Sequence, residues 1–462
     1  MNIIRNGKLV TPDGIRCEDI AFENGRITKI GTIPAKEDDN VIDAEGCYVF
    51  PGFIDEHTHL EMNTGTAWTA DDFESGTRAA AAGGTTSIVD FATQDKGGTL
   101  TDALNLWKNN AKGHSHCNVA FHMAVTDWNE EVKQEIPKMI EAGVSSFKVY
   151  MAYDNLMISD PELLELLRAI REAGGICGCH CENGPVINTL QREEIAKGNT
   201  GPAGHPASRP AECEAEALNR FAYLALLADC PIYIVHLSSR LGLEEVRFAR
   251  KRGQTVYAET CPQYLLLEES VYHLPGFESA KYVCSPPIRK AEDVKALRQA
   301  LFAGEIEALA TDHCSFRYDG QKTMGKDDFR KIPNGLPGIE HRPAVLFTAL
   351  REPSGLNEED FMCFMNRVLT VGPAKLMGMY GRKGILAEGA DADITIWDPR
   401  KQWTITAEDQ NQNVDYTPYE GMVCTGKARE VFVNGILAAK DGTPTKEIPG
   451  TYVKRRFENG HD

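Results

Sequence analysis

Residues 146–183, "SFKVYMAYDNLMISDPELLELLRAIREAGGICGCHCEN", contain a complete strand–helix–strand pattern. The runs 146–153 and 176–183 are short and rich in β-forming residues, which is typical of strands. Between them, residues 160–175 carry apolar side chains at helical spacing and end in Gly-Gly, which is typical of a helix and its end. The stretch therefore predicts a strand, a helix and a second strand in succession.

The same alternation runs through the middle of the chain. Further strand-like runs, separated by helical stretches, occupy residues 85–92, 117–126, 231–238, 255–262 and 308–314. The apolar run Val49–Ile54, just before His57, completes a set of eight. Eight strands alternating with helices are typical of a (β/α)8 barrel. We therefore predict an α/β protein with a TIM-like barrel over residues 51–380.

The two ends of the chain have a different pattern. Residues 1–50 and 381–462 alternate apolar and polar side chains, contain Asn-Gly and Asp-Gly turns, and have little helical character. This pattern is typical of short strands joined by tight turns. We expect the ends to pair into a smaller β-sandwich, with residues 1–50 as its N-terminal part and residues 381–462 as its C-terminal part and tail.

Composition restricts the partners and the compartment. The net charge of −18 over 462 residues disfavours nucleic acid and anionic membranes, because both would repel such a surface. No apolar run approaches the ~18–20 residues of a membrane span, and the first residues are too polar for a signal peptide. The thirteen cysteines are scattered and odd in number, which indicates reduced thiols. We expect a cytoplasmic protein.

In such a barrel, chemistry takes place at the carboxyl ends of the strands. His57 and His59 follow the first strand at a spacing of two, which directs both imidazoles to the same side. Lys148 lies in the otherwise apolar run 145–153, where an unpaired ammonium would be costly. Other residues of the metal-ligand type at strand ends are His180, His236 and Asp312.

Together these side chains can hold two divalent metal ions. An ammonium cannot bind a cation, but a lysine that has reacted with carbon dioxide carries a carbamate, which can bridge two ions as a carboxylate does. The nitrogen and oxygen ligands suit zinc best, with manganese or cobalt as substitutes. Cys179 and Cys181 fall on the strand face opposite His180, so we interpret them as packing residues.

The ordered motifs of this chain resemble those of one family. They are "GFIDEHTHL", "SSFKVYMAY", "HCENG", "YIVHLSS", "ETCPQYLLL", "CSPPIR", "ATDHC" and "MGKDDFRKIPNGLPGIEHR". The series is similar, over nearly the whole chain, to the hydantoinase/dihydropyrimidinase branch of the amidohydrolase superfamily. The resemblance implies a barrel with a β-sandwich, a homotetramer, and a binuclear metal-dependent enzyme. That enzyme would open hydantoins or dihydropyrimidines to N-carbamoyl amino acids.

The resemblance also implies a role for each metal ligand. The more buried ion would be held by His57 and His59, and the more exposed ion by His180 and His236. Lys148, as N6-carboxylysine, would bridge the two ions.

The same resemblance assigns the catalytic and substrate-binding residues. Asp312 would complete the shell of the buried ion and carry the proton from the attacking water to the leaving nitrogen. Tyr153 would bind the substrate and stabilise its oxyanion. Backbone groups of Ser285 and Asn334 would hold the cyclic amide.

Two alternatives remain open at the level of sequence. One is an allantoinase-like hydrolase of cyclic ureides. The other, of a different class, is a non-catalytic dihydropyrimidinase-related interaction protein, although all six ligand positions are filled here. The loop 60–73, "LEMNTGTAWTADDF", departs from the more aromatic and proline-bearing loop of typical dihydropyrimidinases, which weakens the case for dihydrouracil. Leu156 and Met157 offer an apolar wall for a substituent.

Some polar residues receive no role from the sequence. Those that could support the site or be ordinary rim charges are Asp55, Glu61 and Arg289. The histidines that we interpret as surface or structural residues are His114, His116, His205, His273, His341 and His461.

Overall fold

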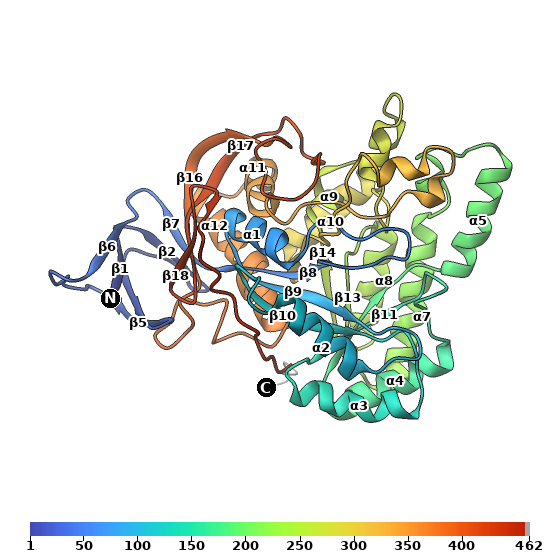
Figure 1. The fold of residues 1–462 in the computed structure, drawn as a ribbon, viewed down its shortest axis with the longest axis horizontal. Helices are drawn as coiled ribbons and strands as arrows, with labels where there is room; N and C mark the ends of the chain where they lie inside the picture. Colours follow the sequence, from blue (N-terminus) through green and yellow to red (C-terminus); the bar gives the residue numbers. More distant parts are fainter. Residues whose placement is uncertain (458–462) are drawn as a thin grey trace.

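The computed structural model describes residues 1–457 and contains the predicted barrel (Figure 1). His461 lies outside the described residues. Eight parallel strands follow one another in sequence order around the sheet. They are β8 (Phe53–Thr58), β9 (Thr85–Thr93), β10 (Asn118–Ala124), β11 (Ser146–Tyr150), β12 (Ile176–His180), β13 (Ile232–Ile234), β14 (Val256–Thr260) and β15 (Ala308–Leu309). A parallel bridge between Thr58 and His313 joins the two ends of the sheet, so the barrel is nearly closed.

Helices form the outer layer of the barrel (Figure 1). The α-helices are α1 (Phe73–Gly83), α2 (Leu100–Ala111), α3 (Glu130–Glu141), α4 (Asp160–Ala173), α5 (Gly184–Ala196), α6 (Gly204–Ala207), α7 (Ala211–Ala228), α8 (Arg240–Lys251), α9 (Pro262–Leu266), α10 (Ala291–Ala303), α11 (Arg342–Ser354), α12 (Glu358–Asn366) and α13 (Gly372–Leu376). Short 3₁₀ helices are η1 (Glu269–His273), η2 (Glu278–Tyr282), η3 (Lys322–Gly325) and η4 (Phe329–Lys331), and η5 (Arg367–Val371) is a π-helix.

The stretch 146–183 folds as the sequence predicts. Strand β11 leads into α4, and β12 then pairs in parallel with β11. Helix α4 begins after Ser159, whose hydroxyl and Glu162 form a capping box, and it ends at Gly174 in the left-handed conformation. The buried face of α4 carries leucine and isoleucine side chains against the barrel, which explains the helical spacing of apolar residues.

The chain ends form a sandwich of two sheets beside the barrel (Figure 1). The seven-stranded sheet contains β2 (Lys8–Thr11), β3 (Gly14–Arg16), β7 (Tyr48–Pro51), β16 (Ile394–Thr404), β17 (Val423–Val433), β18 (Ile436–Lys440) and β19 (Thr443–Pro444). The four-stranded sheet contains β1 (Asn2–Arg5), β4 (Asp19–Glu23), β5 (Arg26–Gly31) and β6 (Asn40–Asp43). Antiparallel pairing of β7 with β16, with Val49 opposite Ile396, joins the two termini and confirms the predicted sandwich.

The apolar run Val49–Ile54 is two strands rather than the single predicted one. Its first part is in β7 of the sandwich, and its second part is in β8 of the barrel. Gly52 separates them, and a Cβ added there would lie 2.0 Å from the Thr86 hydroxyl. The chain therefore passes from one sheet to the other where only glycine fits.

We propose domain boundaries at residues 1–50 and 381–462 for the sandwich and 51–380 for the barrel. The change of sheet near Gly52 supports the first boundary. The end of α13 before the sandwich strand β16 supports the second.

The main core lies between the barrel strands and the outer helices. Cys179 and Cys181 are buried in this core, and all thirteen cysteines are free thiols. Arg455, from the last described segment, is buried and donates hydrogen bonds to Met377 O, Phe121 O and Ser146 Oγ. Within residues 1–457, no helix is both long enough and apolar enough to cross a membrane.

Candidate metal centre and active site

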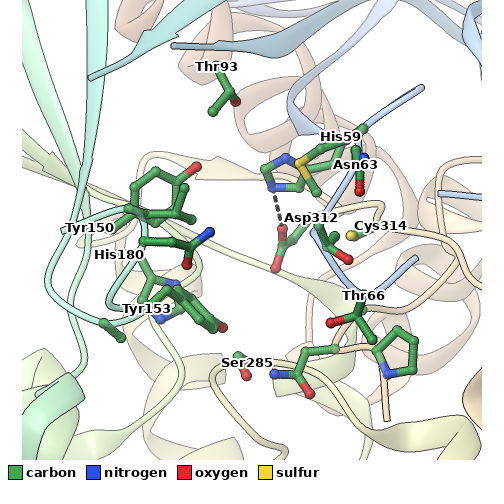
Figure 2. Close-up of a pocket in the computed structure, with 18 of the residues that line it drawn as sticks. His59, Asn63, Thr66, Thr93, Tyr150, Tyr153, His180, Ser285, Asp312 and Cys314 are labelled. Carbon is green, nitrogen blue, oxygen red and sulfur yellow. Dashed lines mark ion pairs between the residues drawn. The ribbon is translucent and has the colours of Figure 1, made fainter. Parts of the chain in front are cut away.

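A cavity of about 800 Å³ opens at the carboxyl ends of the barrel strands. Figure 2 shows that Asp312 and His59 face each other in it, with Tyr150, His180 and Tyr153 on one side. The structure places every predicted site residue on the wall of this cavity: His57, His59, Lys148, Tyr153, His180, His236, Ser285, Asp312 and Asn334.

The first group of ligands is formed by His57, His59 and Asp312, which come together from opposite ends of the barrel sequence. Asp312 Oδ1 lies 3.1 Å from His57 Nε2 and 3.2 Å from His59 Nε2. The two Nε2 atoms are 3.2 Å apart. Ligand atoms about 2.0–2.2 Å from one zinc ion in a tetrahedron are separated by roughly 3.3 Å. These three atoms can therefore hold one metal ion.

The second group is a pair of histidines beside the first. His180 ends β12, and its Nδ1 lies 2.9 Å from His236 Nε2. The rings of His236 and His57 have centroids 5.4 Å apart. The second pair of histidines thus adjoins the first group.

Buried carboxylates orient one histidine in each group. His57 Nδ1 bonds to Glu259, and His180 Nε2 lies 2.9 Å from Glu182. Where one ring nitrogen donates its N–H to the carboxylate, the other ring nitrogen faces the cavity and is the one available to bind a metal. A divalent cation bound there would displace a proton from the nitrogens that face each other. The donor set of His57, His59 and Asp312 fits such an ion.

The charges of the site follow from burial and from these contacts. Burial opposes protonation of His57, but Glu259 and Asp312 outweigh it and raise its pKa to about 9. Burial lowers the pKa of His59 to about 4. Burial would raise the pKa of Glu182, but Arg209 and His180 lower it to about 2.

Lys148 projects from β11 into the centre of the site. Its side chain is buried, and its Nζ lies 5.0 Å from the centroid of the Phe91 ring and 5.4 Å from that of Tyr150. Burial lowers the pKa of Lys148 although Asp312 and Glu259 oppose the shift. The cavity wall therefore carries a buried amine in addition to the two histidine groups.

Three site residues have an unusual backbone conformation. Of the nine residues other than glycine with positive φ among residues 1–457, these three are Tyr153, His236 and Asp312, at 70°, 39° and 53°. Tyrosine rarely adopts this left-handed conformation, and strained residues of this kind cluster at functional sites. The strand ends are therefore held in shapes that direct these three side chains into the cavity.

The cavity wall also contains the predicted substrate-binding groups. Ser285 follows η2, and Asn334 follows η4. Leu156 lines the cavity as expected, but Met157 does not. The Met157 sulfur lies 3.2 Å from where a Cβ on Gly184 would be, so this side chain packs under the start of α5.

Several residues that no sequence pattern marks support the ligands. Asp55 accepts hydrogen bonds from Thr311 N and Oγ1 at 3.1 and 2.7 Å, next to Asp312. Arg209 bonds to Glu182 and lines the cavity. Glu259 is a charged residue in a buried strand, and Glu182 lies two residues after His180. Neither residue is part of a recognised sequence motif for metal ligands.

The other polar residues without a role from the sequence differ in whether they are buried or exposed. Glu61 lines the cavity. Arg289 lies behind it and donates to Ser238 Oγ at 3.0 Å. The histidines that are buried, and therefore structural rather than surface residues, are His116, His205 and His341. The exposed ones are His114 and His273.

Comparison with known proteins identifies the family. Residues 48–437 match the Amidohydrolase family. The chain belongs to the amidohydrolase family. It is 42% identical over 459 residues to a D-hydantoinase of Geobacillus stearothermophilus, covering 98% of this chain and 96% of that protein. It is 39% identical over 462 residues to a D-phenylhydantoinase of Escherichia coli O81 (strain ED1a), covering 98% of each.

Solved structures agree with the sequence comparison. The crystal structure of dihydropyrimidinase from Brevibacillus agri NCHU1002 matches this amidohydrolase with a TM-score of 0.96 and 40% sequence identity, covering 99% of each chain. The predicted family and fold are therefore confirmed, and this amidohydrolase is a hydrolytic enzyme.

Proposed function

We propose that this amidohydrolase opens the ring of hydantoins or dihydropyrimidines by hydrolysis, to give N-carbamoyl amino acids. The observation that carries the proposal is the convergence of four histidines, one aspartate and one lysine in a single cavity. Relatives named as hydantoinases, similar over the whole chain, support the choice of substrate. The same convergence argues against a non-catalytic interaction protein.

We further propose two zinc ions as the bound metals. His57, His59 and Asp312 would hold one ion, and His180 and His236 the other. Lys148, as its carbamate, would supply the bridging carboxylate between the two groups, which also removes its buried positive charge. Bound divalent ions lower the pKa of water to about 7 and polarise carbonyl oxygens.

The protein side chains would then direct the reaction. Asp312 takes the proton of the attacking water and delivers it to the ring nitrogen that leaves. Tyr153 donates its hydroxyl hydrogen to the oxygen on which negative charge develops. Its burial, which raises its pKa, keeps that hydrogen in place at neutral pH. Backbone groups near Ser285 and Asn334 hold the amide edge of the ring.

A panel of substrates tests the proposed function directly. Purified protein of known metal content would be assayed with dihydrouracil, hydantoin, 5-phenylhydantoin, allantoin and dihydroorotate. We expect turnover of at least one hydantoin. Absence of hydrolysis of every compound would contradict the proposal.

One observation favours a second candidate substrate. Asn63, Thr64 and Thr66 line the cavity, alongside Met62 and Trp68 of the same loop. The three polar side chains would suit a cyclic ureide with a polar substituent, as in an allantoinase-like enzyme. Faster turnover of allantoin than of 5-phenylhydantoin would select this candidate.

Removal of metal is expected to remove activity. Because the attacking water depends on the ions for its acidity, activity should fall in proportion to metal content during chelation and return with added zinc. Elemental analysis alongside the assay checks this and should approach two ions per chain. Full activity in metal-free protein would contradict the proposed centre.

Replacement of Tyr153 by phenylalanine is expected to slow turnover while both metals remain. Loss of one oxyanion donor costs roughly 10²–10³ in kcat. KM should change little, because a contact that strengthens only in the transition state contributes little to substrate binding. Measured kcat, KM and metal content check this. An unchanged kcat would remove Tyr153 from the reaction.

We also propose a homotetramer in the cytoplasm. The free thiols support a reducing compartment. Exposed apolar side chains on α7, among them Leu226 and Leu227, support burial of that helix against another copy.

A further inference from the structure

Lys322, at the start of η3, is a second buried lysine near the cavity. Its side chain is 0% exposed. Its Nζ donates hydrogen bonds to the backbone carbonyls of Val283, Pro333 and Gly335, at 2.8, 3.0 and 2.8 Å. An ammonium has three N–H donors, so each of them is used.

The three carbonyls belong to the two segments that hold Ser285 and Asn334. Val283 lies two residues before Ser285, and Pro333 and Gly335 are the neighbours of Asn334. The two segments also bond to each other, since Gly335 N donates to Val283 O at 3.0 Å. Lys322 therefore joins two loops that are about fifty residues apart in sequence at a single point.

The position of Asn334 is closely fitted as well. Gly335 has a φ of +157°, and a Cβ added there would lie 2.2 Å from Cys314 O. Cys314 N in turn donates to Leu336 O at 3.1 Å. The loop therefore lies directly on the strand end that carries Asp312, so a shift of this loop would move Asn334 relative to the metal ligands.

The ammonium of Lys322 has no carboxylate partner among residues 1–457. Burial lowers its pKa to about 7. In contrast, the buried Lys383 forms ion pairs with Asp391 and Asp393. Burying a charge without a counter-charge costs free energy. Here the three carbonyl oxygens that accept hydrogen bonds from the ammonium stabilise that charge.

Lys322 itself is absent from the cavity wall. We propose that Lys322 is a positioning residue, which fixes segments 283–285 and 333–335 relative to each other and so sets the distance between the two groups that hold the ring. This inference rests on the proposed roles of Ser285 and Asn334. It assigns Lys322 no contact with the substrate.

The test uses the variant Lys322→Met in the metal-loaded, full-length protein. Hydrogen–deuterium exchange of peptides covering residues 281–289 and 332–340 should become faster in both segments, since Gly335 N–H and its neighbours lose their fixed geometry. KM for the best substrate should rise about tenfold or more while kcat changes less, as expected when binding common to ground and transition states is lost.

Two further variants make the result specific. Lys322→Gln keeps two N–H donors and should give intermediate exchange and an intermediate KM; it also carries the test if the methionine variant does not fold. Lys383→Met removes a buried lysine far from the cavity, and it should lower stability without changing KM or exchange in the two segments.

The outcomes separate this inference from the proposed function. Unchanged hydrogen–deuterium exchange in both segments would overturn the proposal that Lys322 tethers segments 283–285 and 333–335 to each other, whatever the substrate. Faster exchange with unchanged KM would overturn the positioning role, because the segments would then not hold the ring. Absence of turnover in the parent protein would contradict the proposed function alone, and the exchange result would still decide the tether.

Discussion

Replacement of Lys148 by alanine is expected to remove metal from the protein and to reduce turnover below detection. Lys148 is buried in the wall of the cavity that also holds both histidine groups, and its proposed carbamate would be the one ligand common to both ions. Without it, the proposed ion at His180 and His236 loses its carboxylate ligand, and binding of that ion should fail first. Elemental analysis and the hydantoin assay check both losses.

Chemical rescue distinguishes loss of a ligand from general damage. Alanine leaves a space the size of the lysine side chain, so added acetate or propionate can occupy it and supply a carboxylate. We expect these acids to restore part of the metal content and part of the activity in Lys148→Ala, and to have no effect on the parent protein. Normal metal content and rate in the variant without added acid would show that Lys148 is not the bridge.

Asp312→Asn is expected to lower kcat by about 10⁴-fold, at the upper limit of what a positioned general base contributes. Asp312 has two roles, because its Oδ1 lies beside His57 and His59 and it is also the proposed proton carrier. Asparagine keeps the shape but has neither the negative charge nor a basic oxygen. Turnover should therefore be lost even in molecules that retain metal.

Asp71→Asn is a matched control for this change. Asp71 is a buried carboxylate 3.1 Å from His313, the residue after Asp312, and it does not line the cavity. Its replacement should cost stability and leave kcat within about tenfold of the parent, since it touches no reacting group. Equal losses in the two variants would mean that the effect of Asp312→Asn is not specific to proton transfer. A metal-loaded Asp312→Asn with normal kcat would mean that Asp312 carries no proton.

The strand ends and their ligands could be predicted from the sequence for a physical reason. Barrel strands alternate with helices at a regular spacing, and ligand residues such as His57 and Lys148 stand out in apolar runs. Glu182 is equally buried and bonds to His180 only two residues earlier, but this spacing is not a recognised ligand pattern. Glu259 is also buried, and its partner is a ring nitrogen of His57 on another strand. Only the packing of the barrel brings these atoms together, and sequence spacing carries no signal of it.

Two other features lay beyond the sequence for different reasons. The division of Val49–Ile54 between two sheets depends on close contact between Gly52 and Thr86, which hydrophobic pattern alone does not reveal. The Lys322 tether depends on backbone carbonyls, which every residue has, so no side-chain pattern marks its partners. Ser285 and Asn334 could be proposed only from the resemblance to a family, because both occur in ordinary turn sequences.

The pairing of β7 with β16 can form only late in the synthesis of the chain. Val49 and its partner Ile396 are separated by the entire barrel sequence, which a ribosome takes on the order of 20–70 s to synthesise. During that interval β7 has no β16 partner, and one of its edges offers unpaired backbone groups to other chains. Rapid sheltering of the nascent chain, by early barrel formation or by a chaperone, therefore determines how much of this enzyme reaches its native state.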